Sequence, residues 1–188
     1  MDNRAVILEN ALELFSLQGY DAVGVQEICS RAGITKPTLY YYFGSKRGLL
    51  DAILNEKYAQ LKSIIENAAV YKGDLPLTLY KVVSAYFSYA SNNPIFYRLQ
   101  MSILFSPPEC ESFKAVLPIL ESQLKILEEL FINASKNHGN MKGRHKPYAV
   151  SLLGMVNTYI QMCFSGTIEI NDEVTFKAVH QYMHGIYS

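Results

Sequence analysis

The feature that most constrains this chain is a short segment, residues 33–46, which reads Gly-Ile-Thr-Lys-Pro-Thr-Leu-Tyr-Tyr-Tyr-Phe-Gly-Ser-Lys. Glycine suits the left-handed position that ends a helix, so Gly33 predicts a helix end. Thr35 and Pro37 predict the cap and first turn of a new helix, because the first N–H groups of a helix lack partners within it. Ser45 predicts the cap of a further helix, with Lys46 at its first position. The segment therefore predicts a short helix over residues 36–43.

This short helix is expected to present a polar and aromatic surface. Leu39 and Phe43 are four residues apart, so they share one face and can pack inward. The remaining surface then carries Lys36, Thr38, Tyr40, Tyr41 and Tyr42. Exposed aromatic clusters usually bind something. A glycine turn followed by a helix with hydroxyls and cations is typical of the reading element of a helix-turn-helix, although this geometry also serves purely structural roles.

Basic residues gather around the same helix. Between residues 28 and 50 the chain carries Arg31, Lys36, Lys46 and Arg47, and no acid. A helix N-terminus beside a lysine is a good phosphate site. The whole chain has 17 basic and 17 acidic residues, so its formal net charge is zero. Any nucleic-acid surface must therefore be local.

The rest of the sequence predicts an all-α protein, because apolar residues recur at helical spacing and no strand pattern is present. Helices are expected over 3–18, 25–32, 36–43, 46–70, 77–91, 95–105, 110–136, 147–165 and 173–187. The helix from residue 46 outlasts the small bundle that it helps to build. We therefore expect a helix-turn-helix domain over 1–46, linked by helix 46–70 to a second helical domain over 47–188.

Several functional classes find no support in the sequence. The three cysteines, Cys29, Cys110 and Cys163, are scattered and form no C-x-x-C pair, which fits a reducing cytosol. The first residues do not resemble a signal peptide, so we expect a cytoplasmic protein. No catalytic set and no phosphate-binding glycine pattern is recognisable. We expect neither an enzyme nor a cofactor.

Two patterns have competing interpretations. His180 and His184 are four apart, which is a metal-chelating spacing, but no acid or thiolate lies nearby in sequence, so polar residues of a dimer helix are favoured. Residues 147–168 contain no charged side chain, which is long enough for a membrane span. Ser151, Asn157 and Gln161 interrupt that run. A helix between its own core and a partner subunit has the same composition, and we favour that interpretation.

Two further groups of residues are candidate sites. The last two helices are expected to form a dimer interface through Leu152, Val156, Tyr159, Ile160, Phe176, Val179 and Met183. The middle of the chain is unusually aromatic, and a buried tyrosine needs a partner for its hydroxyl, which favours a partly polar cavity. Candidate lining residues of an effector pocket there are Tyr86, Tyr89, Phe96, Tyr97, Met101, Phe105 and Phe113; the alternative is an ordinary core.

The first 55 residues resemble the DNA-binding region of the tetracycline-repressor (TetR) family of bacterial regulators. The resemblance rests on Ala-Leu-Glu-Leu-Phe at 11–15, Gly-Tyr at 19–20, Ile at 28, Ala-Gly at 32–33, Lys-Pro-Thr-Leu-Tyr-Tyr-Tyr-Phe at 36–43, Ser-Lys at 45–46 and Leu-Leu at 49–50. It implies a homodimer whose two reading helices enter successive major grooves of a near-palindromic operator. It also implies a small-molecule effector in the C-terminal region.

Carried over position by position, the resemblance implies that Thr38, Tyr41 and Tyr42 face bases. Tyr40 and Lys46 would contact phosphate, and Thr35 would cap the helix and reach the DNA backbone. Family members often have Ser or Thr where this chain has Gly24, which offers no hydroxyl to a phosphate. We therefore expect a transcriptional regulator, a repressor relieved by a largely apolar small molecule. The alternative is a helical dimer that binds a protein partner through a vestigial DNA surface.

Overall fold

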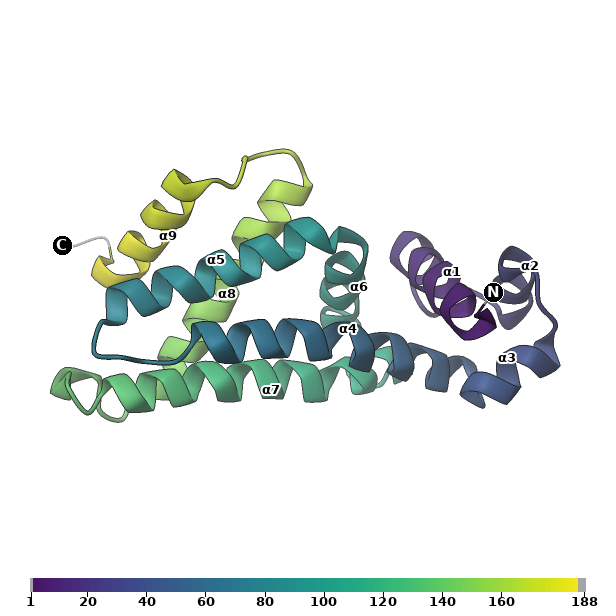
Figure 1. Ribbon diagram of the computed structural model, residues 1–188, viewed down its shortest axis with the longest axis horizontal. Coiled ribbons are helices and arrows are strands. Elements are labelled where there is room, and N and C mark those ends of the chain that lie inside the picture. The colour runs from purple at the N-terminus through teal and green to yellow at the C-terminus, as the bar shows by residue number, and fades with distance from the viewer. Residues whose placement is uncertain (1, 186–188) are drawn as a thin grey trace. The chain divides into compact units, whose positions relative to one another are not determined.

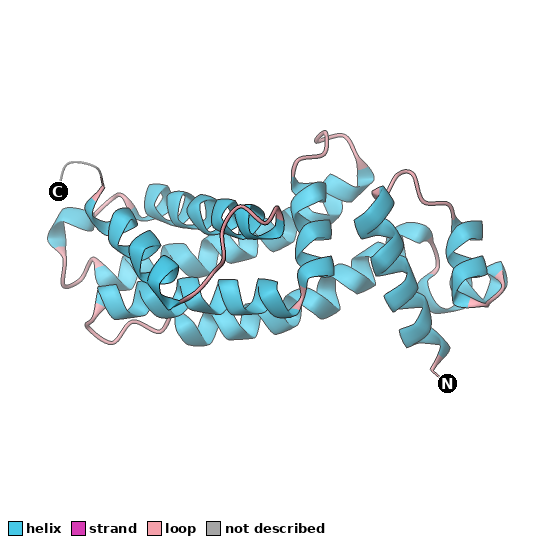
Figure 2. Cartoon of the chain, turned by 90° about the horizontal axis from the view of Figure 1, so that it is seen from above, coloured by secondary structure: helices cyan, strands magenta, loops and turns pink. Residues whose placement is uncertain are grey.

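The computed structural model describes residues 2–185, apart from the side chain of residue 140, and this part of the chain contains helices and no strands (Figures 1 and 2). The α-helices are α1 Asn3–Gln18, α2 Val25–Ala32, α3 Lys36–Phe43, α4 Lys46–Ala68, α5 Leu75–Asn92, α6 Pro94–Leu104, α7 Glu111–Ala134, α8 His145–Phe164 and α9 Asp172–His184; a 3₁₀ turn, η1, covers Gly139–Met141. The predicted all-α class is confirmed, and the helices begin and end within a few residues of the expected positions. The final residues of the helix expected over 173–187 lie outside the described part.

Short polar side chains start several of these helices. The Asp2 carboxylate accepts a hydrogen bond from the Arg4 N–H at 3.0 Å, and the Asn171 side chain accepts from the Val174 N–H at 2.9 Å. Ser45 caps α4 as expected, because its hydroxyl accepts from the Gly48 N–H at 2.9 Å. These bonds satisfy N–H groups that the helices themselves leave without partners.

Gly48 fixes the corner between α3 and α4. A Cβ added at this position would overlap the carbonyl oxygen of Phe43, the last residue of α3. The first turn of α4 therefore approaches the end of α3 more closely than any side chain would allow.

The chain forms two compact units. The first contains the residues up to Ala59 together with Asn93–Ile119, and the second contains Gln60–Asn92 and the residues from Leu120 onward. Both α4 and α7 contribute residues to each unit. The expected boundary near residue 46 did not anticipate that α6 and the start of α7 join the helix-turn-helix. The functional domain limits stay a prediction.

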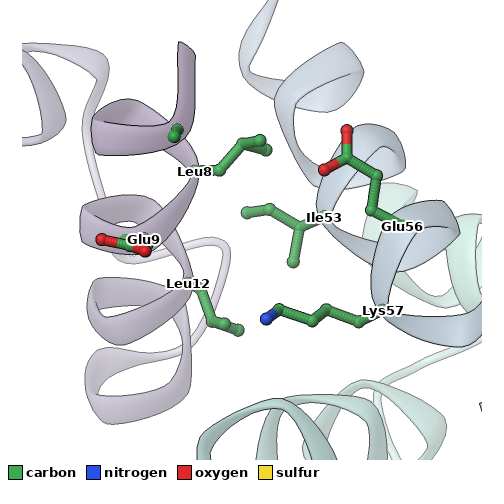
Figure 3. A pocket seen from close by; sticks show the side chains of 7 residues that line it. Leu8, Glu9, Leu12, Ile53, Glu56 and Lys57 are labelled. Atoms are coloured by element: carbon green, nitrogen blue, oxygen red, sulfur yellow. The ribbon is translucent and has the colours of Figure 1, made fainter. Parts of the chain in front are cut away.

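In the first unit, α1 packs against α2 and α6. Its core includes the fully buried side chains of Ile7, Phe15, Ile28, Leu39 and Leu49. Helices α1 and α4 also face each other across a small cavity of about 140 Å³ (Figure 3). Figure 3 shows Leu8 and Ile53 pointing toward one another there, with the Lys57 side chain extending toward Leu12.

In the second unit, α5 packs against α8 and α9. Val82 and Tyr86 of α5 are fully buried, as are Leu152 and Val156 of α8. The uncharged composition of α8 therefore has a local cause, because one side of this helix lies in the core of its own chain. Among residues 2–185, no helix is both long and apolar enough to cross a membrane.

Candidate nucleic-acid interface

A glycine turn sets the position of α3. Gly33 adopts φ 66° and ψ 33°, the left-handed conformation that was predicted for it. Its N–H and the next one, from Ile34, donate to carbonyls in the last turn of α2, including that of Cys29. Thr35 follows with φ −97° and ψ 159° and occupies the N-cap position of α3. The order helix, tight turn, short helix is the helix-turn-helix arrangement.

The inward face of α3 is narrow. Leu39 has no exposed surface, as its spacing predicted, and it anchors the helix to the core of the first unit. Phe43 is only half-buried, and the Arg4 guanidinium lies 5.7 Å from the centre of its ring. One leucine thus holds α3 in place, and most of the surface of this helix is left to solvent.

The outward face of α3 is formed by the three consecutive tyrosines. Tyr41 is 83% exposed, Tyr40 45% and Tyr42 38%, so all three lie on the outer surface of the helix as their spacing predicted. The rings of Tyr41 and Tyr42 meet edge to face with centroids 5.2 Å apart. This surface offers hydroxyls that both donate and accept hydrogen bonds, next to apolar ring faces, which is the chemistry that reads base edges in a major groove.

Two threonines extend the tyrosine surface. The hydroxyl oxygens of Thr35 and Thr38 are 2.9 Å apart, so one donates to the other. The Thr35 side chain makes no capping bond to the backbone of α3, which corrects the expectation that it would cap the helix with its hydroxyl. The physical reason is that this hydroxyl bonds to Thr38 instead.

The cations around α3 are mostly paired. Arg31 forms an ion pair with Glu13, and Arg47 forms one with Asp51 at 2.8 Å. Lys36 is exposed and, within the described residues, has no ion pair. The acid-free window of the sequence therefore overstates the local positive charge, because the acids that pair with it come from outside that window.

Lys46 ties the start of α4 to the loop between α1 and α2. Its ammonium donates to the carbonyl oxygens of Tyr20 at 2.7 Å and Val23 at 2.8 Å, and it lies 4.2 Å from the centre of the Tyr20 ring. Partial burial lowers the pKa of Lys46, although Asp21 and Glu111 oppose this shift. An ammonium has three N–H donors, so one remains for the phosphate contact that the family resemblance implies.

A second set of contacts to the same loop, made by Glu111 at the start of α7, was not predicted from the sequence. The Tyr20 hydroxyl donates to the Glu111 carboxylate at 2.5 Å, and Arg47 Nη1 donates to the Glu111 carbonyl oxygen at 2.8 Å. Burial, followed by the bond to Glu111, raises the pKa of Tyr20. The start of α7 is thus bound to the helix-turn-helix. No sequence signal pointed to this contact, because Tyr20 and Glu111 are 91 residues apart.

The candidate pocket aromatics divide between the two units. Tyr86 and Tyr89 belong to the second unit and are buried, and burial raises the pKa of Tyr89 to about 12. Five lie in the first unit, where Phe96, Tyr97 and Met101 are buried, Phe113 is half-buried and Phe105 is 83% exposed. Their role as pocket residues stays a prediction. A cavity of about 510 Å³ in the second unit has a different lining.

The candidate dimer residues also divide into two groups. The side chains of Leu152, Val156, Ile160 and Val179 are buried within their own chain. They hold α8 and α9 in the core of the second unit, so they are not available to a partner surface. Tyr159 and Met183 are half-buried, and Phe176 is 61% exposed. Val150 and Met162, 49% and 37% exposed, add apolar surface on α8 that the sequence list omitted.

The two histidines of α9 lie side by side. The rings of His180 and His184 have centroids 4.4 Å apart, and Phe176 follows at 6.0 Å from His180. Within residues 2–185, no three histidine, cysteine or acidic side chains come together in a way that could hold a metal ion.

The sequence has clear relatives. Residues 7–53 match the profile described as bacterial regulatory proteins, tetR family. The HTH-type transcriptional regulator YuxN of Bacillus subtilis is 40% identical over 80 residues, which are 43% of this chain and 27% of YuxN. The HTH-type transcriptional activator FasR of Mycolicibacterium smegmatis is 30% identical over 159 residues, 82% of this chain and 68% of FasR. The chain thus spans about a quarter of YuxN and about two thirds of FasR.

Solved structures share the fold along nearly the whole chain. FadR of Bacillus subtilis, a transcriptional regulator whose crystal structure contains stearoyl-CoA, superposes with a TM-score of 0.81 at 20% identity. The superposition covers 97% of this chain and 99% of the FadR chain. The likeness to FadR shows the fold alone, whereas the sequence relatives YuxN and FasR are both named as transcriptional regulators, in line with the expectation of a regulator.

Proposed function

Because the chain belongs to the tetR family of bacterial regulatory proteins, we propose that it is a transcriptional regulator that binds a near-palindromic operator as a homodimer. It acts in the cytoplasm, as a repressor that leaves its operator when a small, largely apolar molecule binds to the residues after position 46. The observation that carries the proposal is the outward face of α3, where three tyrosines stand exposed on a helix that Leu39 anchors.

Within this proposal, the residues of α3 divide into two roles. Tyr41, Tyr42 and Thr38 read base edges, while Tyr40, Lys36 and Lys46 meet phosphates and position the helix. The exposed cation Lys36 and the free third N–H of Lys46 support the second role. Thr35 lies at the N-terminus of α3, where its hydroxyl is exposed beside the backbone N–H groups that favour anions.

Selection of bound sequences from random DNA tests the proposal directly. We expect a near-palindromic site whose binding weakens steeply with salt, because phosphate contacts release counterions. Tyr41→Ala should cost about 1–3 kcal/mol of binding free energy on that site and relax its sequence preference. The matched control is Leu17→Ala, which removes another exposed side chain of the first unit, 76% exposed on α1. Failure to select any site would favour the alternative, a helical dimer that binds a protein partner.

Effector release requires coupling between the ligand and the operator. α4 contributes its first turns to the unit that contains α3 and its last turns to the other unit, so a ligand that changes the direction of α4 would change the spacing of the two reading helices. Linkage makes this coupling reciprocal and typically worth about 1–3 kcal/mol. The affinity of the effector, measured by calorimetry with and without operator, should therefore change by the same factor as the affinity for operator changes when the effector is added. Equal ligand affinities would exclude release by this route.

A further inference from the structure

A cavity of about 510 Å³ lies within the second unit. It is formed where α5 and α8 begin and α7 and α9 end, on the left of Figure 1, with η1 beside them. The side chains that line it are those of Leu75, Pro76, Leu79, Phe131, His138, Met141, Tyr148, Ser151, Tyr182 and Met183. Its volume falls within the range of about 300–1,000 Å³ that is typical of small-molecule sites, and its lining is predominantly apolar.

The aromatic wall of this cavity consists of three rings in contact. The ring of Phe131 packs against those of Tyr148 and Tyr182, with centroid distances of 5.5 and 6.4 Å. The Tyr182 hydroxyl donates to the Tyr148 carbonyl oxygen at 2.7 Å, so it already has a partner. Burial raises the pKa of Tyr182. The wall therefore offers ring faces more than hydrogen-bonding groups, which suits an aliphatic chain.

A basic segment borders the cavity and contributes His138 and Met141 to its lining. Residues 136–146, which we call the basic loop, contain Lys136, His138, Lys142, Arg144, His145 and Lys146, and the chain has no acid from residue 134 to residue 168. Lys142, Arg144 and Lys146 are exposed and form no ion pair within the described part of the chain.

Three acids on the neighbouring helices α5 and α9 or just before them have partners of their own. Asp74 accepts from the Leu77 N–H at the start of α5, and Asp172 accepts from the Tyr80 hydroxyl. Glu173 forms an ion pair with Lys177. None of these three acids pairs with a cation of the basic loop. His138 brings the loop to the cavity itself, where its Nε2 lies 3.4 Å from the Tyr71 hydroxyl.

We propose that this cavity holds the aliphatic chain of an acyl ligand whose anionic head lies against the basic loop. The inference rests on the proposed function, of which this ligand would be the effector. An apolar, aromatic-walled cavity selects the chain, and the unpaired cations select an anionic head over a neutral one. The head is a carboxylate if the ligand is a fatty acid, and a set of phosphates if it is an acyl thioester of coenzyme A.

Calorimetry on the full chain tests the proposal with four probes: laurate and lauroyl-CoA below their critical micelle concentrations, dodecanol below its solubility limit, and coenzyme A alone. We expect laurate or lauroyl-CoA to bind one per chain and dodecanol to bind about tenfold more weakly, since tenfold corresponds to about 1.4 kcal/mol. Tighter binding of lauroyl-CoA, with weak binding of coenzyme A alone, identifies the thioester. Equal or tighter binding of laurate identifies the fatty acid.

Two variants locate the probe. Ser151 is exposed at the rim, so Ser151→Trp should fill the cavity from outside without disturbing the core, and it should weaken acyl binding by about tenfold or more. Lys142→Glu combined with Arg144→Glu should weaken the anionic probes by about tenfold and leave dodecanol unchanged. Lys125→Glu is the matched control, because Lys125 is exposed on α7 and does not line the cavity. It should bind all probes like the wild type.

The same proteins are titrated with the selected operator in the absence of any probe. Operator binding without acyl binding would overturn this inference and leave the proposed regulator intact. Acyl binding without operator binding would overturn the proposed function and not the cavity assignment. Unchanged acyl affinity in a Ser151→Trp protein that melts like the wild type would also overturn the assignment.

Discussion

Replacing Lys46 by methionine should destabilise the protein even when no DNA is present. Methionine keeps an unbranched apolar stem and removes the ammonium, which donates to the carbonyl oxygens of Tyr20 and Val23 at 2.7 and 2.8 Å. Both carbonyls then lose this donor, and the Tyr20 ring loses the cation 4.2 Å from its centre. The loop between α1 and α2 is thereby released from the start of α4.

The magnitude follows from these contacts. A hydrogen bond to a charged group contributes about 1.5–3 kcal/mol, and we take the lower end for each because Lys46 is only half-buried. The cation–π contact adds about 0.5 kcal/mol. Desolvation of the ammonium, which lowers the pKa of Lys46, offsets part of this sum, leaving a net loss of about 2 kcal/mol. For a chain of this size, the expected fall in Tm is roughly 4–8 °C.

Thermal unfolding followed by circular dichroism at neutral pH measures this loss. The control is Lys36→Met, which makes the same exchange at an exposed cation of α3 and should change stability by no more than about 0.5 kcal/mol. A Lys46→Met protein that melts at the wild-type temperature would show that these contacts contribute nothing to folding, and the reasoning would fail.

Three other perturbations probe the remaining surfaces. Lys46→Ala should weaken binding to all DNA sequences alike and lower the slope of log affinity against log salt by about one, whereas an unchanged slope would mean that the ammonium meets only the backbone carbonyls. Phe176→Glu, on the exposed face of α9, should convert the dimer to monomers in sedimentation while the helical circular dichroism of the chain is retained; an intact dimer would exclude this face. Burial and the bond to Glu111 raise the pKa of Tyr20, so the stability that Tyr20 contributes is fully present below the ordinary tyrosine pKa of about 10 and is lost as the pH rises further. The stability difference between wild type and Tyr20→Phe should therefore be constant to about pH 9 and shrink progressively above pH 10, and a difference that is as large at about pH 11 as at about pH 8 would contradict this.

The reading helix could be predicted because its determinants are local. Gly33, Pro37 and Ser45 mark its limits within a few residues of where they act, and the inward position of Leu39 follows from helical spacing alone. The half-burial of Phe43 could not be predicted in this way, since it depends on where Arg4 of another helix lies.

The electrostatics of the site could not be predicted from a window of sequence. The acids that pair with Arg31 and Arg47 lie at positions 13 and 51, and Glu111 is brought to Tyr20 and Arg47 by the packing of the first unit. Only the fold decides which cations are left for a ligand, and in this site Lys36 is the clearest candidate.

The candidate dimer residues show a second limit of prediction from the sequence. An uncharged helix results equally from contact with its own core and from contact with a partner, and composition does not separate the two causes. The structure assigns Leu152, Val156 and Ile160 to the core of their own chain. A charge at Val156, which tests the interface in principle, would therefore test folding instead, and exposed Phe176 is the better position.

The cavity of the second unit illustrates a third limit. The sequence directed attention to the aromatic middle of the chain, whereas the cavity arises where four helices begin or end, and Leu75 and Met183 on its wall are far apart in sequence. The absence of acids from the basic loop can be read from the sequence alone. The position of this loop beside a cavity could not be predicted from the sequence, because the cavity forms only when α5, α7, α8 and α9 pack together.

The bare Cα of Gly48 has a consequence for how any signal reaches DNA. The Phe43 carbonyl oxygen packs directly against this Cα, so the corner between α3 and α4 is closely packed. A rotation of the first turn of α4 should therefore rotate α3 and its tyrosines by a similar angle. The tyrosines of α3 and the first turn of α4 are then expected to move together as one rigid body. A larger residue at position 48 would force α3 and α4 apart. It would therefore weaken the coupling between the two helices even if every tyrosine were kept.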